Sequence, residues 1–183
     1  MVDLDRATVE RKLVLLLGYV DELESLVGDS RRRSSGNVVR RAIERLVQLI
    51  VETLMDANGA LAADGGFAPP ASGRESFDVV ERLRAVSPEL AQRFRASYVG
   101  LRNRIVHEYE TLDEVMVLRA ARRLVGDARA YASAVRSFLS RPPGASAVRE
   151  PRVRYRKTSR PGSNRPVGAP RSRAPQVRGK CAR

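Results

Sequence analysis

The stretch RAIERLVQLIVETLMDANGAL, which runs from Arg41 to Leu61, decides the fold class. Its apolar residues, extended back to Val39, recur every three or four positions: Val39, Ile43, Leu46, Ile50, Leu54, Ala57 and Leu61. This spacing is typical of an α-helix with one apolar face, because 3.6 residues make one helical turn. The stretch therefore predicts a long helix in the core of the fold.

The same spacing recurs on both sides of this stretch. The stripe before it consists of Val9, Leu13, Leu16, Val20, Leu23 and Val27, and Gly28 is a plausible helix end. Three stripes follow it: Phe77, Val80, Leu83 and Val86; Leu90, Phe94, Tyr98, Leu101 and Ile105; and Val117, Ala121, Leu124, Ala128, Tyr131, Val135 and Phe138. No segment alternates in the manner of a strand. The pattern predicts an all-α bundle of four long helices plus one short helix.

Local signals predict where these helices begin and end. Glycines and prolines between Gly65 and Gly73 indicate a loop. The pair Ser87-Pro88 suits the start of a helix, since serine is a good N-cap and proline fits the first helical position. Thr111 and Glu114 stand at the spacing of a capping box. The fourth helix is therefore expected to end between about His107 and Glu110.

The positive charge of the chain is concentrated at its C-terminal end. The 183 residues have a formal net charge of +13, but Arg141–Arg183 holds 13 basic residues and one acidic residue. This segment also holds seven of the ten prolines, and it has almost no apolar periodicity. We predict a helical domain over residues 4–140 and a disordered Arg/Pro-rich tail over residues 141–183. The tail is either an electrostatic arm for RNA or another polyanion, or an extension without a function.

Several classes of protein do not fit this composition. No window approaches the roughly 18 consecutive apolar residues that a membrane-spanning helix needs, and the N-terminus does not resemble a secretory signal. A cytoplasmic location without a membrane partner is expected. Cys181 and His107 are the only cysteine and histidine, which excludes a site built from several such ligands. No metal ion or other cofactor is expected.

One short stretch carries candidate chemistry: LRNRIVHEY, from Leu101 to Tyr109. It places Arg102, Asn103, His107 and Tyr109 near the end of a helix, although each residue alone is compatible with a structural role. At about 100° per residue, Asn103 and His107 are about 40° apart and share a face, whereas Arg102 and His107 are about 140° apart. Arg102 and His107 would converge if two copies of this helix met across a two-fold axis. A homodimer would then be a condition of activity.

The stretch LRNRIVHEY resembles the signature of the HepT-like branch of the HEPN superfamily. In that signature an Arg and a polar residue are followed by three residues, and then by His, any residue and Tyr. The resemblance covers roughly residues 5–140. The segment Arg41 to Leu61 looks like the second helix of that family, including the pair Glu52 and Asp56. Two features depart from the pattern: Gly59 stands where the family often has a larger residue, and the basic tail has no counterpart.

The resemblance implies a metal-independent endoribonuclease that acts as the toxin of a toxin–antitoxin system of the HepT/MntA type. The partner of such a toxin is a minimal nucleotidyltransferase antitoxin, which transfers AMP to the motif tyrosine, here Tyr109. The chemistry of the motif agrees with cleavage through the 2′-OH of RNA. Imidazole titrates near neutral pH, which suits His107 to proton transfer, and Arg102 offers a permanently charged fork for phosphate oxygens. Asn103 is expected to support them by orienting the imidazole or contacting substrate.

Other interpretations remain open at this stage. The domain is alternatively a non-catalytic HEPN module that binds a nucleotidyltransferase or RNA, or a bundle that only dimerises while the tail binds RNA. Arg104 either adds phosphate affinity or is a solvated surface residue. Glu52 and Asp56 are four residues apart and share a helix face. There are three alternatives for this pair. Either the two carboxylates line the cleft and anchor an arginine, or they bind the partner, or they form an acidic face paired with basic neighbours.

Overall fold

The computed structural model describes residues 3–28, 36–107 and 113–141. The regular structure in this part of the chain is helical, in the order α1 (Asp3–Gly28), α2 (Gly36–Asp64), α3 (Gly73–Arg82), α4 (Pro88–Arg93), η2 (Phe94–Tyr98), α5 (Val99–His107) and α6 (Glu114–Leu139). Because α4, η2 and α5 are continuous, these ranges contain five helices, of which α3 is the short one. The predicted all-α bundle is confirmed. All but the first residue of the predicted tail lies outside the described residues.

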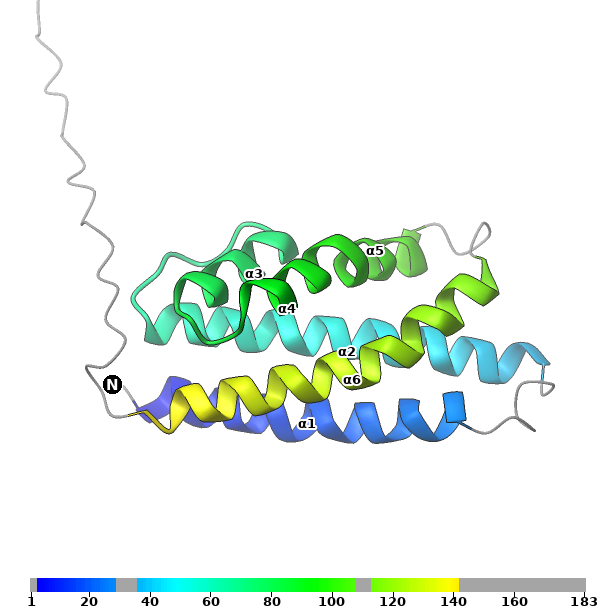
Figure 1. Ribbon diagram of the computed structural model, residues 1–183, viewed down its shortest axis with the longest axis horizontal. Helices are drawn as coiled ribbons and strands as arrows, with labels where there is room; N and C mark the ends of the chain where they lie inside the picture. Colours follow the sequence, from blue (N-terminus) through cyan, green and yellow to red (C-terminus); the bar gives the residue numbers. More distant parts are fainter. Residues whose placement is uncertain (1–2, 29–35, 108–112, 142–183) are drawn as a thin grey trace, which may run out of the picture. The chain divides into compact units, whose positions relative to one another are not determined.

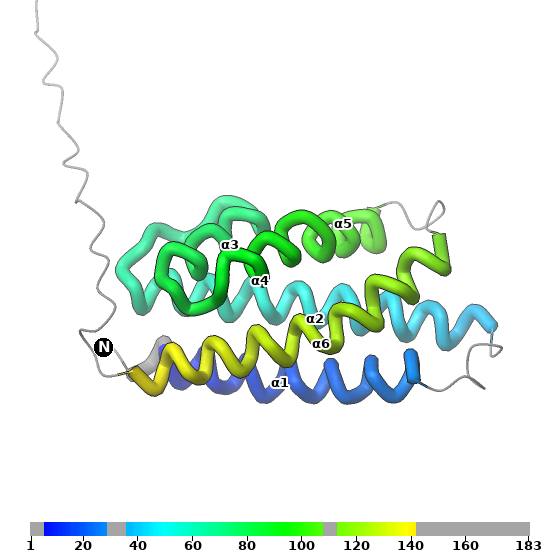
Figure 2. Tube along the Cα trace, in the orientation of Figure 1, coloured from blue at the N-terminus to red at the C-terminus, as the bar shows by residue number. Residues whose placement is uncertain are grey.

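The bundle is organised around α2. Figure 1 shows α3, α4 and α5 along one side of α2, α1 along the other side, and α6 crossing α1 and α2 obliquely. The tube in Figure 2 shows that α5 runs antiparallel to α2. The predicted apolar stripes lie inside: every member of the α1 stripe is at most 6% exposed. Burial of these stripes is the main favourable term in folding.

An aromatic cluster packs the continuous helix formed by α4, η2 and α5 against α3 and α6. The rings of Phe77 and Phe94 stack with centroids 4.9 Å apart. Tyr98 and Tyr131 lie against Phe94 with centroid distances of 5.2 and 6.0 Å. The ring of Tyr131 comes from α6, so this cluster joins three helices.

A buried hydrogen-bond network crosses the same region. Asn58, which is 0% exposed, donates from Nδ2 to Ser76 Oγ at 3.1 Å and accepts from the Tyr131 hydroxyl at 2.6 Å. Ser76 in turn donates to the carbonyl of Gly73 at 2.7 Å. Burial raises the pKa of Tyr131, so its hydroxyl stays protonated and keeps donating. The network connects α2, α3 and α6.

Three local features differ from the sequence-based expectation. The helix α3 ends at Arg82, and Leu83 and Val86 are buried in a turn in which Arg84 has a φ of 56°. The cap of α6 is Asp113, whose Oδ1 accepts from the backbone of the next turn, so the predicted capping box that began at Thr111 is wrong. The fourth helix is interrupted by η2, a π turn.

Gly59 does not disturb the packing of α2. An added Cβ at this position would meet nothing within 4 Å. The position therefore has room for a Cβ, and the glycine is not required by the packing of the core.

The helix α2 is long and apolar enough to cross a membrane by length and composition, with a mean hydropathy of 1.2 over 18 residues. However, 56% of that window is buried within the bundle. This burial is typical of the core helix of a soluble domain.

Candidate active site

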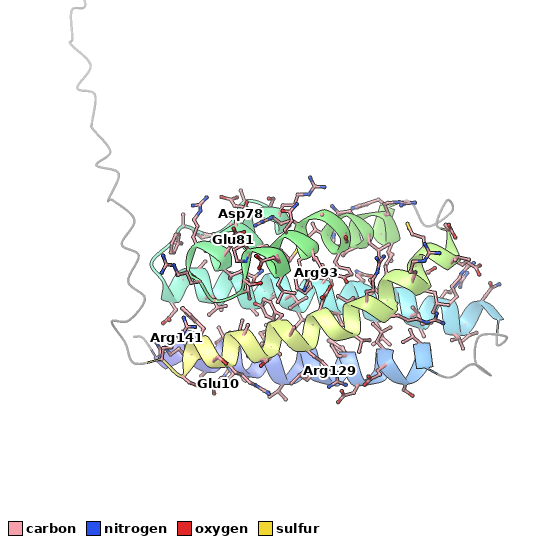
Figure 3. All side chains as sticks on the ribbon, in the orientation of Figure 1. Glu10, Asp78, Glu81, Arg93, Arg129 and Arg141 are labelled. Atoms are coloured by element: carbon pink, nitrogen blue, oxygen red, sulfur yellow. The ribbon has the colours of Figure 1, made fainter. Side chains whose placement is uncertain are left out.

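The helix that carries the LRNRIVHEY motif is held at its start by the π turn η2. In this turn the backbone N–H of Val99 donates to the carbonyl of Phe94, five residues earlier. Arg95, within the turn, donates to Asp78 at 2.7 Å and to Glu81 at 2.6 Å. Both carboxylates lie on α3, as labelled in Figure 3. The turn is thereby tied to α3.

Tyr98 ties the other end of η2 to α6. Its hydroxyl donates to Asp127 Oδ2 at 2.7 Å, and Arg93 Nε donates to Oδ1 of the same carboxylate at 3.0 Å. Figure 3 shows Arg93 between α4 and α6. Burial and the bond to Asp127 raise the pKa of the Tyr98 hydroxyl, so it remains a donor. These contacts fix the position and rotation of α5.

Arg102 lies against α2, where Glu52 holds its guanidinium. Its Nη2 and Nε donate to Glu52 Oε1 at 2.6 and 3.1 Å. Its Nη1 donates to Asn103 Oδ1 at 3.3 Å. The Arg102 side chain is 24% exposed, so the guanidinium is positioned by α2 and still reaches solvent.

Glu52 is kept ionised by its surroundings. Burial opposes its ionisation, but hydrogen bonds from Gln48 and Arg102, and the charges of Arg102 and Arg45, outweigh that cost and hold the pKa of Glu52 below its ordinary value. The bond from Gln48 Nε2 is 3.0 Å long. A permanently charged Glu52 gives Arg102 a constant partner near neutral pH.

His107 is the last residue of α5, and it is exposed. Within the described ranges its imidazole makes no hydrogen bond or ion pair, so it is accessible to a substrate. Asn103 is exposed as well, whereas Arg104 points to α6 and contacts Met116 Sδ at 3.5 Å. The structure therefore brings Arg102 and Asn103 together and leaves His107 apart. Tyr109 lies outside the described residues.

Glu52 and Asp56 have different partners despite sharing a face of α2. Asp56 pairs with Lys12 Nζ of α1 at 2.6 Å, whereas Glu52 pairs with Arg102. The interpretation as an acidic face with basic partners is confirmed for both residues, and Glu52 also anchors the motif arginine. The residues that sequence reasoning missed are Gln48, Lys12 and Asp127. Only the Gln48–Glu52 pair had a local signal, its spacing of four.

In the three described ranges, no group of three or more His, Cys, Asp or Glu side chains is placed to hold a metal ion. The carboxylate beside α5, that of Glu52, is instead paired with Arg102.

We expect a Glu52→Gln variant to lose stability in a pH-dependent way. Because the pKa of Glu52 is lowered on folding, its contribution is present above the unfolded value of about 4.3 and is lost as pH falls through the lowered value. Urea midpoints of wild type and variant should therefore differ most near neutral pH and converge in acid. An Arg102→Gln variant should show a weaker dependence of stability on pH than wild type, because Arg102 helps to lower the pKa of Glu52. A difference that grows as pH falls would contradict this assignment.

Sequence and structure comparisons give matches over most of the chain. The family described as Ribonuclease HepT-like matches residues 16–135. The "tRNA nuclease HepT" of Aphanizomenon flos-aquae (strain 2012/KM1/D3) is 28% identical over 140 residues, which are 76% of this chain and 95% of the relative. The match thus includes the helices that build the candidate site.

Solved structures share the fold at lower sequence identity. A crystal structure of a toxin–antitoxin with AMP-PNP has a TM-score of 0.66 at 17% identity, covering 72% of this chain and 98% of that chain. The tri-AMPylated Shewanella oneidensis HEPN toxin in complex with MNT antitoxin has a TM-score of 0.65 at 18% identity, covering 71% and 97%. The cytosolic protein of unknown function YutE from Bacillus subtilis has a TM-score of 0.62 at 17% identity, covering 74% and 90%. These similarities establish the helical fold.

Proposed function

The chain belongs to the HepT-like ribonuclease family, and from this we propose that it is a metal-independent endoribonuclease that acts as the toxin of a toxin–antitoxin pair. The observation that carries the proposal is the placement of the motif on α5. Arg102 is held by Glu52 at 2.6 Å, and His107 is exposed five residues later. The relative named as a tRNA nuclease supports RNA as the substrate class.

The proposed reaction uses the 2′-OH of the RNA as the nucleophile. The 2′ oxygen forms a bond to phosphorus, the bond from phosphorus to the 5′ oxygen breaks, and the 2′ proton leaves while the 5′ oxygen gains a proton. The products are a 2′,3′-cyclic phosphate and a 5′-OH. His107 moves a proton, since an imidazole nitrogen can act as a general acid or a general base. The Arg102 guanidinium stabilises the extra charge on the non-bridging oxygens, and Asn103 supports it.

We further propose that the active form is a homodimer. Arg102 and His107 are about 140° apart around one regular helix, and Arg102 is bound to α2 whereas His107 is exposed. A two-fold axis beside α5 would bring the residues of two protomers to one cleft. Such a dimer also supplies two imidazoles, one for each proton of the reaction.

The proposed control of the toxin is AMP transfer to Tyr109 by a nucleotidyltransferase antitoxin. AMP two residues beyond His107 would add bulk and negative charge at the cleft, which opposes RNA binding. The tri-AMPylated toxin of Shewanella oneidensis in complex with its antitoxin supports this proposal. The name of YutE as a cytosolic protein supports a cytoplasmic location.

We expect purified protein to cut total RNA in EDTA, and we expect antitoxin with ATP to stop the cutting. A Tyr109→Phe variant should still cut RNA but should resist the antitoxin, because phenylalanine has no hydroxyl to receive AMP. Gel analysis of the RNA and the intact mass of the protein report the two effects. Added AMP corresponds to a covalent mass increase.

The matched control is Tyr19→Phe, which removes a tyrosine hydroxyl on α1 and should remain sensitive to the antitoxin. Inhibition of Tyr109→Phe to the same extent as wild type would contradict the modification site. A wild-type dimer that cuts no RNA would contradict the ribonuclease proposal and favour a non-catalytic module that binds the nucleotidyltransferase or RNA.

A further inference from the structure

Two arginines of α2 lie on the same face as Glu52. Arg45 precedes Glu52 by seven residues and Arg41 precedes it by eleven, so each is within about 20° of Glu52 around the helix. Both side chains are exposed. The charge of Arg45 acts on Glu52 directly, since it contributes to the lowered pKa of that carboxyl. The basic stripe formed by Arg41, Arg45 and Arg102 is thus continuous with the candidate site.

The antiparallel packing of α2 and α5 determines where the arginines of this stripe lie along the helix axis relative to His107 (Figure 2). The bond between Arg102 and Glu52 fixes the register of the two helices. From Arg102 to His107, α5 advances about 7.5 Å, and from Glu52 back to Arg45, α2 covers about 10.5 Å in the same direction. Arg45 therefore lies a few ångströms beyond the level of His107, and Arg41 lies one further turn along.

In the part of the chain that the structure describes, the two arginines also differ from several other arginines of the bundle in forming no ion pair or hydrogen bond. Arg40 pairs with Glu114, and other arginines of the bundle pair with carboxylates, among them Arg95 and Arg129. Within the described ranges, Arg41 and Arg45 form no hydrogen bond or ion pair. Their guanidinium groups are available to an anionic ligand.

We propose that Arg41 and Arg45 bind backbone phosphates of the RNA strand on the His107 side of the scissile bond. The inference rests on the proposed ribonuclease function and assigns its substrate a direction along α2. An RNA strand fits better than an acidic protein surface because the stripe is one residue wide and continues from the arginine that faces the scissile phosphate. Arg41 and Arg45, four residues and about 6 Å apart along the axis of α2, would meet successive phosphates.

The test is the binding and cleavage of RNA by Arg41→Gln, Arg45→Gln and the double variant in the full chain. Along a single strand each phosphate contact contributes about 0.7 to the slope of log K against log salt, so at about 0.1 M salt each substitution should weaken binding about five-fold. The double variant should lose about 25-fold. The loss should appear in KM, and the salt slope should fall with each substitution. Binding is measured in a His107→Ala background, in which the RNA stays intact.

The matched control is Arg136→Gln, which removes an exposed arginine from the last turn of α6, at the opposite end of the bundle from the end of α5. It should leave KM and the salt slope at their wild-type values. If the wild type cuts RNA and the stripe variants match Arg136→Gln, the inference is overturned while the proposed function stands. Weaker binding of the antitoxin with unchanged RNA kinetics would overturn it in favour of a protein partner. A wild type that neither binds nor cuts RNA would overturn both.

Discussion

A His107→Ala variant is expected to lose RNA cleavage by a factor of about 10² to 10⁴, the usual contribution of a positioned general acid or base. Alanine cannot carry a proton, and His107 is the only histidine of the chain. In the proposed dimer the substitution removes both imidazoles at once. The measurement is the initial rate of cleavage of total RNA in EDTA at neutral pH.

The fold should tolerate this change because His107 is exposed at the end of α5 and has no partner within the described ranges. Circular dichroism melting and the molar mass in solution should match the wild type. Ser97→Ala, an exposed hydroxyl on the same continuous helix, is the matched control and should keep full activity. Cleavage by His107→Ala at the wild-type rate would remove His107 from the mechanism.

An Asn58→Leu variant is expected to lose about 2–3 kcal/mol of folding free energy. Leucine has the same branching and the same number of side-chain heavy atoms, but it cannot accept the hydrogen bond that the buried Tyr131 hydroxyl donates at 2.6 Å. A buried donor without a partner costs about 1–3 kcal/mol, and the bond to Ser76 is lost as well. The melting temperature should fall by roughly 5–10 °C for a domain of this size.

The double variant Asn58→Leu/Tyr131→Phe separates hydrogen bonding from packing. Because it also removes the orphaned hydroxyl, it should recover part of the stability lost in the single variant. Urea unfolding of the two single variants and the double variant gives the coupling free energy. Additive losses in the double variant would show that the network contributes nothing beyond the separate side chains.

The helices were predictable from the sequence because burial repeats with the helical period. The stripes of α1, α2 and α6 are continuous, and all their members lie in the core except Val39 and Phe138, which are partly buried against it. The π turn was not predictable in this way. Phe94, Tyr98, Leu101 and Ile105 are spaced four, three and four residues apart, as in an uninterrupted α-helix. The apolar spacing therefore does not distinguish a π turn from a regular α turn. Likewise, α3 ends at Arg82 although the apolar pattern continues to Val86.

The candidate site was predictable only in part. Arg102, Asn103 and His107 stand within six residues, so their common helix followed from local spacing. The pairing of Arg102 with Glu52 did not follow from local spacing, because the two residues are 50 positions apart in the sequence. Glu52 reaches the arginine only through the packing of α2 against α5. The same reason hid Asp127, which meets Tyr98 across 29 residues. Long-range pairs depend on helix rotation, which one sequence does not record.

The π turn makes the direction of the motif depend on the turn before it as well as on its residues. A π turn closes from residue i+5 to residue i, as from Val99 to Phe94, and so takes up one residue more than an α turn. Closing η2 as a regular α turn without removing a residue would rotate everything after it by about 100°. Arg102 would then leave Glu52, and the exposed face of α5 would carry a different set of side chains. A relative with every motif residue and the same spacing, but with a regular α turn in place of η2, would present its arginine and histidine to different surroundings.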